Sequence, residues 1–228
     1  MSTVPKSSHT DRLANSQSAV PLNLVAGKLS RRELRRRMWH MLPGLIPFLL
    51  WPIKHSDPLS PTLKLIILAV AAVVAGSIYV KFRYVSRDNS ENRSEAVLGY
   101  LMSVLGSLLL FPAHPEIGFA VLAVLAFGDG SATFGGLVFP SRSLPWNDDK
   151  TVSGMFSFIL MGTIMVSVIY WGEANPGVDW RSAFLIAAPT SICAAIAESL
   201  PVRLNDNVRV GIVAAIVAPI AQYFVLGF

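Results

Sequence analysis

The chain of 228 residues is 53% hydrophobic and only 14% charged, with a mean hydropathy of +0.52 and a net charge of +5. Soluble domains usually carry about 25% charged residues, so this composition excludes a disordered chain, a basic nucleic-acid-binding domain and an ordinary soluble enzyme. A helix of about 20 apolar residues crosses a bilayer, and the chain has room for about six to eight of them. We therefore expect a polytopic integral membrane protein of the all-α class, a helical bundle with about seven transmembrane helices.

The N-terminal region differs in composition from the rest of the chain. Residues 1–27 are rich in Ser, Thr, Asn and Pro and contain no long apolar stretch, which predicts a mobile cytoplasmic tail. The remainder, 28–228, is predicted to form a single transmembrane domain. A strongly basic segment opens this domain, and Ser30 with Glu33 three residues later forms a capping box that predicts a helix start.

Seven apolar segments follow the basic segment. In chain order they are 41–54, 62–80, 96–111, 117–138, 152–172, 182–199 and 208–227. The first is short and interrupted by three prolines, so it reaches membrane length only if its helix begins near Arg36. The fourth is unusual because Gly128, Asp129 and Gly130 lie inside it.

The Lys and Arg residues indicate an orientation. All but three of the 19 fall in 1–40, 81–95, 139–151 and 200–210, which lie on one side of the membrane if the N-terminus is cytoplasmic. Cytoplasmic loops carry an excess of Lys and Arg, so topology explains the basic charge without a nucleic-acid partner. The lack of an Arg- and Ser-rich amphipathic leader favours a bacterial plasma membrane.

Asp129 is the most informative residue of the chain. A carboxylate at mid-membrane costs roughly 2.5–3.5 kcal/mol and usually marks a site or an ion pair. On a helix, Asp129, Thr133 and Gly136 share a face, which predicts a groove with a carboxylate, a hydroxyl and no bulky side chain. Packing between helices is the alternative explanation for Gly135 and Gly136, but it does not account for Asp129.

Other polar residues gather on the same predicted side of the membrane. They are Glu33, Arg36, Arg37, His40, Glu95, Lys150, Thr151, Gly154, Glu198, Asp206 and Asn207. Each alone has an ordinary alternative role, as an interfacial anchor, a helix-end charge or a cap. Together they predict one cytoplasm-facing polar site set into the bilayer. Carboxylates with Lys, Arg and glycines fit a metal–phosphate site, because Mg²⁺ shares oxygen ligands with substrate phosphates and cations offset phosphate charge.

Five motifs then follow one another along the chain. They are ELRRRMWHMLPG at 33–44, SEAVLGYLMS at 94–103, FGDGSATFGG at 127–136, KTVSGMFSF at 150–158 and AAIAESLPVRLNDNVRV at 194–210. They resemble the motifs of the CTP-dependent lipid-alcohol kinases, namely dolichol kinase, phytol kinase and the CTP-using diacylglycerol kinase, which are similar to the phosphatidate cytidylyltransferases. The glycine–aspartate motif at 127–136 is the most specific. Arg37, Asn205 and Val210 depart from the usual residues, which bears on substrate identity more than on nucleotide use.

The resemblance implies a catalytic domain that transfers the γ-phosphate of CTP to a membrane lipid alcohol with Mg²⁺ as cofactor. The alcohol would be phytol, a polyprenol such as dolichol, or diacylglycerol. Carried over motif by motif, the catalytic residues would be Asp129, Lys150, His40 and Glu95; the metal ligands Asp129, Glu198 and Asp206; and the nucleotide- or phosphate-binding residues Arg36, Arg37, Gly128, Gly130, Thr133, Gly136, Lys150, Thr151, Gly154 and Asn207.

Two alternatives remain open from the residues. A phosphatidate cytidylyltransferase would use the same metal and lysine but attack the α-phosphorus of CTP instead of the γ-phosphorus. A small transporter would use Asp129 for ion coupling. An alternating-access carrier normally has paired broken helices from two repeats, whereas this sequence has one glycine-interrupted segment.

Overall fold

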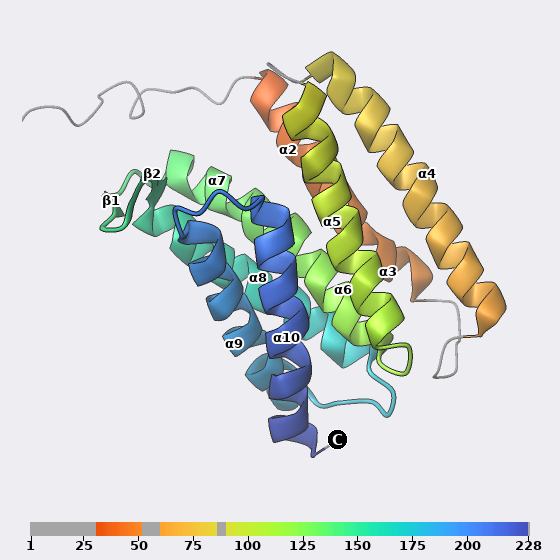
Figure 1. The fold of residues 1–228 in the computed structure, drawn as a ribbon. Coiled ribbons are helices and arrows are strands. Elements are labelled where there is room, and N and C mark those ends of the chain that lie inside the picture. Colours follow the sequence, from red (N-terminus) through yellow and green to blue (C-terminus); the bar gives the residue numbers. More distant parts are fainter. Residues whose placement is uncertain (1–30, 52–59, 86–89, 228) are drawn as a thin grey trace, which may run out of the picture.

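The computed structural model describes residues 31–51, 60–85 and 90–227, and for some helical residues, Arg36 and Glu95 among them, only the backbone (Figure 1). The tail predicted at 1–27 and the capping residue Ser30 lie outside this part of the chain. The described residues form a bundle of helices with one small β-hairpin at one end (Figure 1).

The first helical segment is interrupted, as its prolines predict. It consists of α2 (Arg31–Met41), the 3-10 turn η1 (Leu42–Leu45) and α3 (Ile46–Leu50). Pro43 is the second residue of η1, and Pro47 is the second residue of α3. A proline cannot donate the backbone hydrogen bond of a helix interior, so the chain tightens and restarts at these residues.

Two helices line one side of the bundle. Helix α4 (Pro61–Val85) packs against α2 and against α5 (Ser90–Leu110). Large apolar side chains of α4 remain open to the surroundings; Leu65 is 67% exposed and Val73 is 68% exposed. This apolar outer surface is the one expected of a helix that faces lipid.

The glycine-containing segment forms the centre of the bundle. Helix α6 (Pro115–Ala123), the π-helical turn η2 (Val124–Gly128) and α7 (Asp129–Val138) run without a break and pack against α5, α8 and α10. Every residue of α6 and η2 is buried. The predicted fourth segment is therefore one helical run, Pro115–Val138, and its residues Val124–Gly128 form a π-helical turn.

The C-terminal half contains three long helices and the hairpin. Strands β1 (Ser143–Leu144) and β2 (Asn147–Thr151) pair antiparallel, and they lead into α8 (Val152–Glu173), α9 (Trp180–Ser199) and α10 (Asp206–Leu226). Helix α9 packs against both α8 and α10. The side chains of Thr151, Asp179 and Asn205 each accept backbone N–H bonds at the start of the next helix, which explains where these helices begin.

Four helical segments of the described chain are long and apolar enough to cross a membrane. They are Pro115–Val138, Val152–Glu173, Trp180–Ser199 and Asp206–Leu226, and shorter apolar stretches occupy Pro61–Val70 and Val97–Leu110. The protein is therefore a multi-pass helical membrane protein, and the all-α expectation is confirmed apart from the hairpin. Helices lie over all seven predicted spans, but the number that cross the membrane stays a prediction.

Candidate functional site

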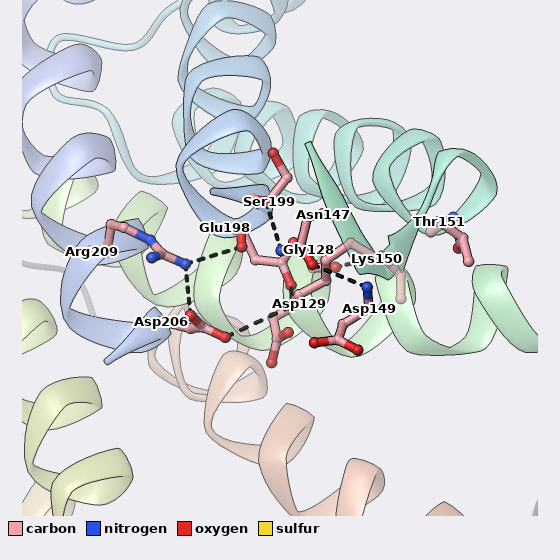
Figure 2. A network of polar contacts seen from close by, with 12 residues as sticks. Gly128, Asp129, Asn147, Asp149, Lys150, Thr151, Glu198, Ser199, Asp206 and Arg209 are labelled. Atoms are coloured by element: carbon pink, nitrogen blue, oxygen red, sulfur yellow. Dashed lines mark hydrogen bonds and ion pairs between the residues drawn. The ribbon is translucent and has the colours of Figure 1, made fainter. Parts of the chain in front are cut away.

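Charged side chains from five separated parts of the sequence lie at the end of the bundle that carries the hairpin (Figures 1 and 2). We call this group the hairpin-end cluster: Arg37, His40, Asp129, Lys150, Glu198, Asp206 and Arg209. It draws on α2, α7, β2, α9 and α10. Six of these seven residues are among those predicted from sequence, so the fold brings the main predicted residues together.

Asp129 is held by two residues of α2. Its Oδ2 lies 3.0 Å from Nε2 of His40 and 3.8 Å from a terminal nitrogen of Arg37. The same His40 nitrogen lies 3.1 Å from the carbonyl oxygen of Leu125. Both neighbours are acceptors, so this nitrogen carries the imidazole proton and donates it. His40 thereby fixes the carboxylate of Asp129 against the central helix.

The π-helical turn makes this arrangement feasible. The N–H of Asp129 bonds to the carbonyls of Val124 and Ala126, and so it bypasses Leu125, its partner in a regular α-helix. The Leu125 carbonyl is left to accept from His40. Single π-helical turns inside α-helices occur frequently at functional sites. Sequence reasoning missed this turn, because the chain carries no local signal for it.

Lys150 of strand β2 lies between two carboxylates, one on α9 and one on α10 (Figure 2). Its Nζ forms a direct ion pair with Glu198, whose side chain is 6% exposed, and lies 3.7 Å from Oδ2 of Asp206. Burial lowers the pKa of Lys150, but the carboxylates of Glu198, Asp206 and Asp129 raise it by more, so the pKa is raised overall. Lys150 is therefore a cation at neutral pH.

The hairpin is tethered to the end of α9, and this contact positions Lys150. The side-chain amide of Asn147 donates to the carbonyl of Ser199 at 2.9 Å (Figure 2). The indole of Trp146 donates to the Ser199 hydroxyl at 3.1 Å. Leu144 of β1 is buried. Because Ser199 follows Glu198, the tether brings β2 directly to the partner of Lys150.

Arg209 is a site residue that sequence reasoning missed. Its guanidinium donates to Oδ1 of Asp206 at 2.6 Å and to the carbonyl of Glu198 at 3.1 Å (Figure 2). The side chain is buried and joins the end of α9 to the start of α10. The spacing of three residues from Asp206 was an available signal, since such pairs meet on one helix face. From sequence, Arg209 is only one of the basic residues of 200–210 that indicate orientation.

The glycines predicted to bind phosphate are packed against side chains of neighbouring elements. A Cβ on Gly128 would lie 2.8 Å from the Phe158 ring, and one on Gly136 would lie 2.8 Å from the Thr151 hydroxyl. Gly130 is packed in the same way against Met41 of α2. Close helix approach therefore explains why these residues are small. Their role in nucleotide binding stays a prediction.

The start of α8 uses its amides within the chain. The N–H of Val152 donates to the Arg142 carbonyl at 3.0 Å, and the N–H of Gly154 donates to the Thr151 hydroxyl at 3.1 Å. The N–H of Ser153 donates to a side-chain hydroxyl of the preceding loop at 2.8 Å. A phosphate at Lys150 would therefore bind through side-chain charge and not through these three amides.

The remaining predicted residues are placed less centrally. Thr133 is half-buried on α7, and the backbone of Asn207 bonds to Asn205 and Ser103 in the first turn of α10. The side chains of Arg36 and Glu95 lie outside the described part of the chain.

The carboxylates of the hairpin-end cluster are candidate ligands for a metal ion. Among the described residues, no three His, Cys, Asp or Glu side chains are grouped tightly enough to hold a metal by themselves. Mg²⁺, however, is usually bound by one or two carboxylates together with substrate phosphates. Asp129, Glu198 and Asp206 fit that second mode, because all three act electrostatically on Lys150. The magnesium site stays a prediction.

Curated proteins supply a family context. The chain is 28% identical to "Phytol kinase 1, chloroplastic" of Arabidopsis thaliana over 82% of its own length and 66% of that protein. It is 26% identical to "Probable phytol kinase 1, chloroplastic" of Oryza sativa subsp. japonica over 90% of this chain and 68% of the relative. "Farnesol kinase, chloroplastic" of Arabidopsis thaliana is 24% identical over 81% of this chain and 64% of the relative.

The chain thus spans about two thirds of the length of these relatives. No family model matches it, and no solved structure matches it.

Proposed function

We propose that this chain, a homologue of plant phytol and farnesol kinases, is a kinase that transfers the γ-phosphate of CTP to an isoprenoid alcohol with Mg²⁺. The observation that carries the proposal is the convergence of Asp129, Lys150, Glu198 and Asp206 from four elements at one end of a membrane bundle. A phosphorylated water-soluble substrate and a lipid alcohol meet at such a position. The excess of Lys and Arg in the segments predicted to be cytoplasmic supports an orientation in which this end faces the cytoplasm.

The cations of the cluster would bind the triphosphate. Lys150 is permanently charged at neutral pH, and its side chain is 30% exposed, so an incoming phosphate can reach it. Arg37, 3.8 Å from Oδ2 of Asp129, adds a second positive charge. Ionised donors form the shortest and strongest hydrogen bonds to phosphate oxygens.

The carboxylates of Asp129, Glu198 and Asp206 would hold the Mg²⁺ that accompanies the nucleotide. Bound there, the ion would offset the negative charge of the phosphates during transfer. The rest of the cluster keeps these carboxylates in place: His40 donates to Asp129, and Arg209 donates to Asp206. Neither positioning residue has to change its partner for a nucleotide to bind.

Transfer requires little covalent chemistry from the protein. The alcohol oxygen forms a bond to the γ-phosphorus, the bond from that phosphorus to the bridging oxygen of the β-phosphate breaks, and CDP leaves. The alcohol gives its proton to a base at the site. Catalysis of this kind consists mainly of alignment and of electrostatic stabilisation of the phosphoryl oxygens, which the arrangement of fixed charges provides.

The test is a paired labelling assay on the full chain in detergent with Mg²⁺. One reaction contains CTP labelled at the γ-phosphate and the other CTP labelled at the α-phosphate. Each is offered phytol, farnesol, a polyprenol, diacylglycerol and phosphatidate. We expect label in phytol or farnesol from the γ position only, and none after chelation of the metal.

Other outcomes would contradict the proposal. Label that enters phosphatidate from the α position alone would identify a cytidylyltransferase. Label from ATP and not from CTP would correct the donor. No transfer from either nucleotide, combined with ion movement that depends on Asp129, would identify a transporter.

A further inference from the structure

Tyr100 of α5 presents a buried hydroxyl to the hairpin-end cluster. Its ring meets the His40 ring edge to face, with centroids 5.4 Å apart and planes at 86°. The negative charge of Asp129 acts on the Tyr100 hydroxyl. The hydroxyl oxygen is buried and makes no hydrogen bond to any described group. Buried polar atoms are nearly always hydrogen-bonded, so each exception requires an explanation.

The position of Tyr100 is enforced by its neighbour in the chain. A Cβ on Gly99 would lie 2.7 Å from the Val208 side chain and 3.0 Å from the Asn205 side chain, so α5 and the start of α10 approach each other closely at this glycine. The adjacent tyrosine therefore has little freedom to move its hydroxyl to another partner. A buried hydroxyl without a partner is destabilising, and a ligand that supplied the missing hydrogen bond would recover that loss.

The surroundings of this hydroxyl favour an alcohol over a phosphate. Phosphate oxygens are matched by the cations of the cluster, whereas the Tyr100 ring packs against the apolar core. Farther along the same helix, a mainly apolar cavity of about 140 Å³ opens between α4 and α5; Leu68, Leu105 and Leu108 line it, together with Lys64. Leu108 lies eight residues beyond Tyr100, about 12 Å along the helix axis.

A polar tip at the cluster and an apolar cavity along the same helix match the two parts of an isoprenoid alcohol. Resting on the proposed function, we infer that the Tyr100 hydroxyl binds the acceptor alcohol, donating a hydrogen bond to the oxygen that receives the phosphate, and that the apolar chain extends along α5 into the α4–α5 cavity. Tyr100 thus sets the acceptor oxygen beside Asp129.

The first experiment removes one oxygen atom. Tyr100→Phe should raise the KM for phytol about fivefold to tenfold, because one hydrogen bond is worth about 1 kcal/mol, and should leave the KM for CTP unchanged. Without alcohol its unfolding temperature should equal or exceed that of the wild type, since the orphaned group is gone. Added phytol should raise the unfolding temperature of the variant by less than it raises that of the wild type. Tyr223→Phe, at a tyrosine that is 62% exposed on α10, is the matched control.

The outcomes are distinguishable. A raised KM for CTP with an unchanged KM for phytol would place Tyr100 at the nucleotide and overturn the inference. A higher unfolding temperature in Tyr100→Phe with unchanged kinetics would show that the hydroxyl binds no substrate, and it would also overturn the inference. If the wild type phosphorylates no alcohol, the proposed function fails; loss of phytol stabilisation in Tyr100→Phe alone would then still support the binding site.

A second variant tests where the apolar tail of the alcohol binds. Leu105→Trp fills the cavity between α4 and α5 and should lower kcat/KM for the longer phytol more than for farnesol. Leu65→Trp adds the same side chain to an outer position of α4 that is 67% exposed and should keep the wild-type ratio. An unchanged ratio in Leu105→Trp would contradict the placement of the chain.

Discussion

The two ends of the bundle carry buried polar residues of different kinds. Opposite the hairpin lies a group that we call the far-end cluster: His114, Glu116, Tyr170 and Gln222. Glu116 and Asp129 belong to the same continuous helical run, and 13 residues of helix place them about 20 Å apart. Gln222 lies in the last turns of α10 (Asp206–Leu226), so the far-end cluster lies at the end of the bundle where α10 terminates.

The far-end cluster contains one carboxylate and no Lys or Arg, and its residues are buried except for His114, whose side chain is 33% exposed. Glu116 is 1% exposed and accepts from the Gln222 amide at 3.1 Å, while the Tyr170 hydroxyl donates to the Gln222 carbonyl at 3.2 Å. These bonds join α6, α8 and α10. At the hairpin end, by contrast, Asp206 is 53% exposed and Lys150 is 30% exposed, and three carboxylates face four basic side chains. Burial of polar groups therefore does not mark the site; accessible charge of both signs does.

The largest expected effect is a loss of phosphoryl transfer when a carboxylate of the hairpin-end cluster is neutralised. Asp129→Asn keeps the size of the side chain but removes its charge, and we expect phosphoryl transfer to fall by about 100-fold or more. The γ-labelled CTP assay measures it. Asp148→Asn makes the same change at an exposed hairpin position two residues from Lys150 and should leave transfer unchanged. Normal activity in Asp129→Asn would remove this carboxylate from the site.

The next test separates stability from activity within the hairpin end. Lys150→Met leaves Glu198 buried without its cation, and we expect a loss of about 2 kcal/mol of unfolding free energy, less than for a fully buried pair because Lys150 is 30% exposed. Adding Glu198→Gln should restore most of that loss but not the activity. Denaturation in detergent and the transfer assay give the two readouts. Recovery of activity in the double variant would show that the pair is only structural.

At the far end we expect the reverse pattern. Gln222→Leu leaves the Tyr170 hydroxyl without its acceptor and removes one of the two polar neighbours of Glu116 Oε1, which should cost about 1–3 kcal/mol of stability. The kcat and KM of the folded fraction should stay at wild-type values. A selective loss of kcat without loss of stability would show that the far-end cluster takes part in the reaction.

The smallest effect concerns pH. The pKa of Lys150 is raised in the folded protein, so its stabilising contribution is fully present below the unfolded pKa of about 10.4 and is lost only as pH rises through the higher folded pKa. The stability difference between wild type and Lys150→Met should therefore be the same at neutral pH and at pH values approaching about 10. A difference that disappears between those values would contradict the ion-paired state of Lys150.

Much of the architecture could be predicted because hydrophobicity is a local property. Each predicted apolar segment overlaps helical structure in the described residues, and Pro43 and Pro47 interrupt the first segment as expected. The motif residues also indicated which charges would meet, since Asp129, Lys150 and Glu198 are unusual in or beside apolar segments. The resemblance to lipid-alcohol kinases, read from those motifs, agrees with the phytol and farnesol kinase relatives.

The arrangement within the site could not be predicted in the same way. The glycines around Asp129 permit both a ligand groove and close helix packing, and only the contacts of Gly128 with Phe158 distinguish the two. The hairpin that carries Lys150 depends on its tether to Ser199, which lies 52 residues away from Asn147. No local pattern encodes a contact over that separation.

The sequence by itself determined that this chain is a multi-pass helical membrane protein, where its helices lie and which charged residues are exceptional, because the cost of placing charge in a bilayer acts on each residue separately. Only the tertiary structure decided that the helix of Asp129 occupies the centre of the bundle, that a π-helical turn leaves a carbonyl for His40, and that Arg209 supports Asp206. These features arise from packing between segments far apart in the chain, and each depends on where its partner lies in space.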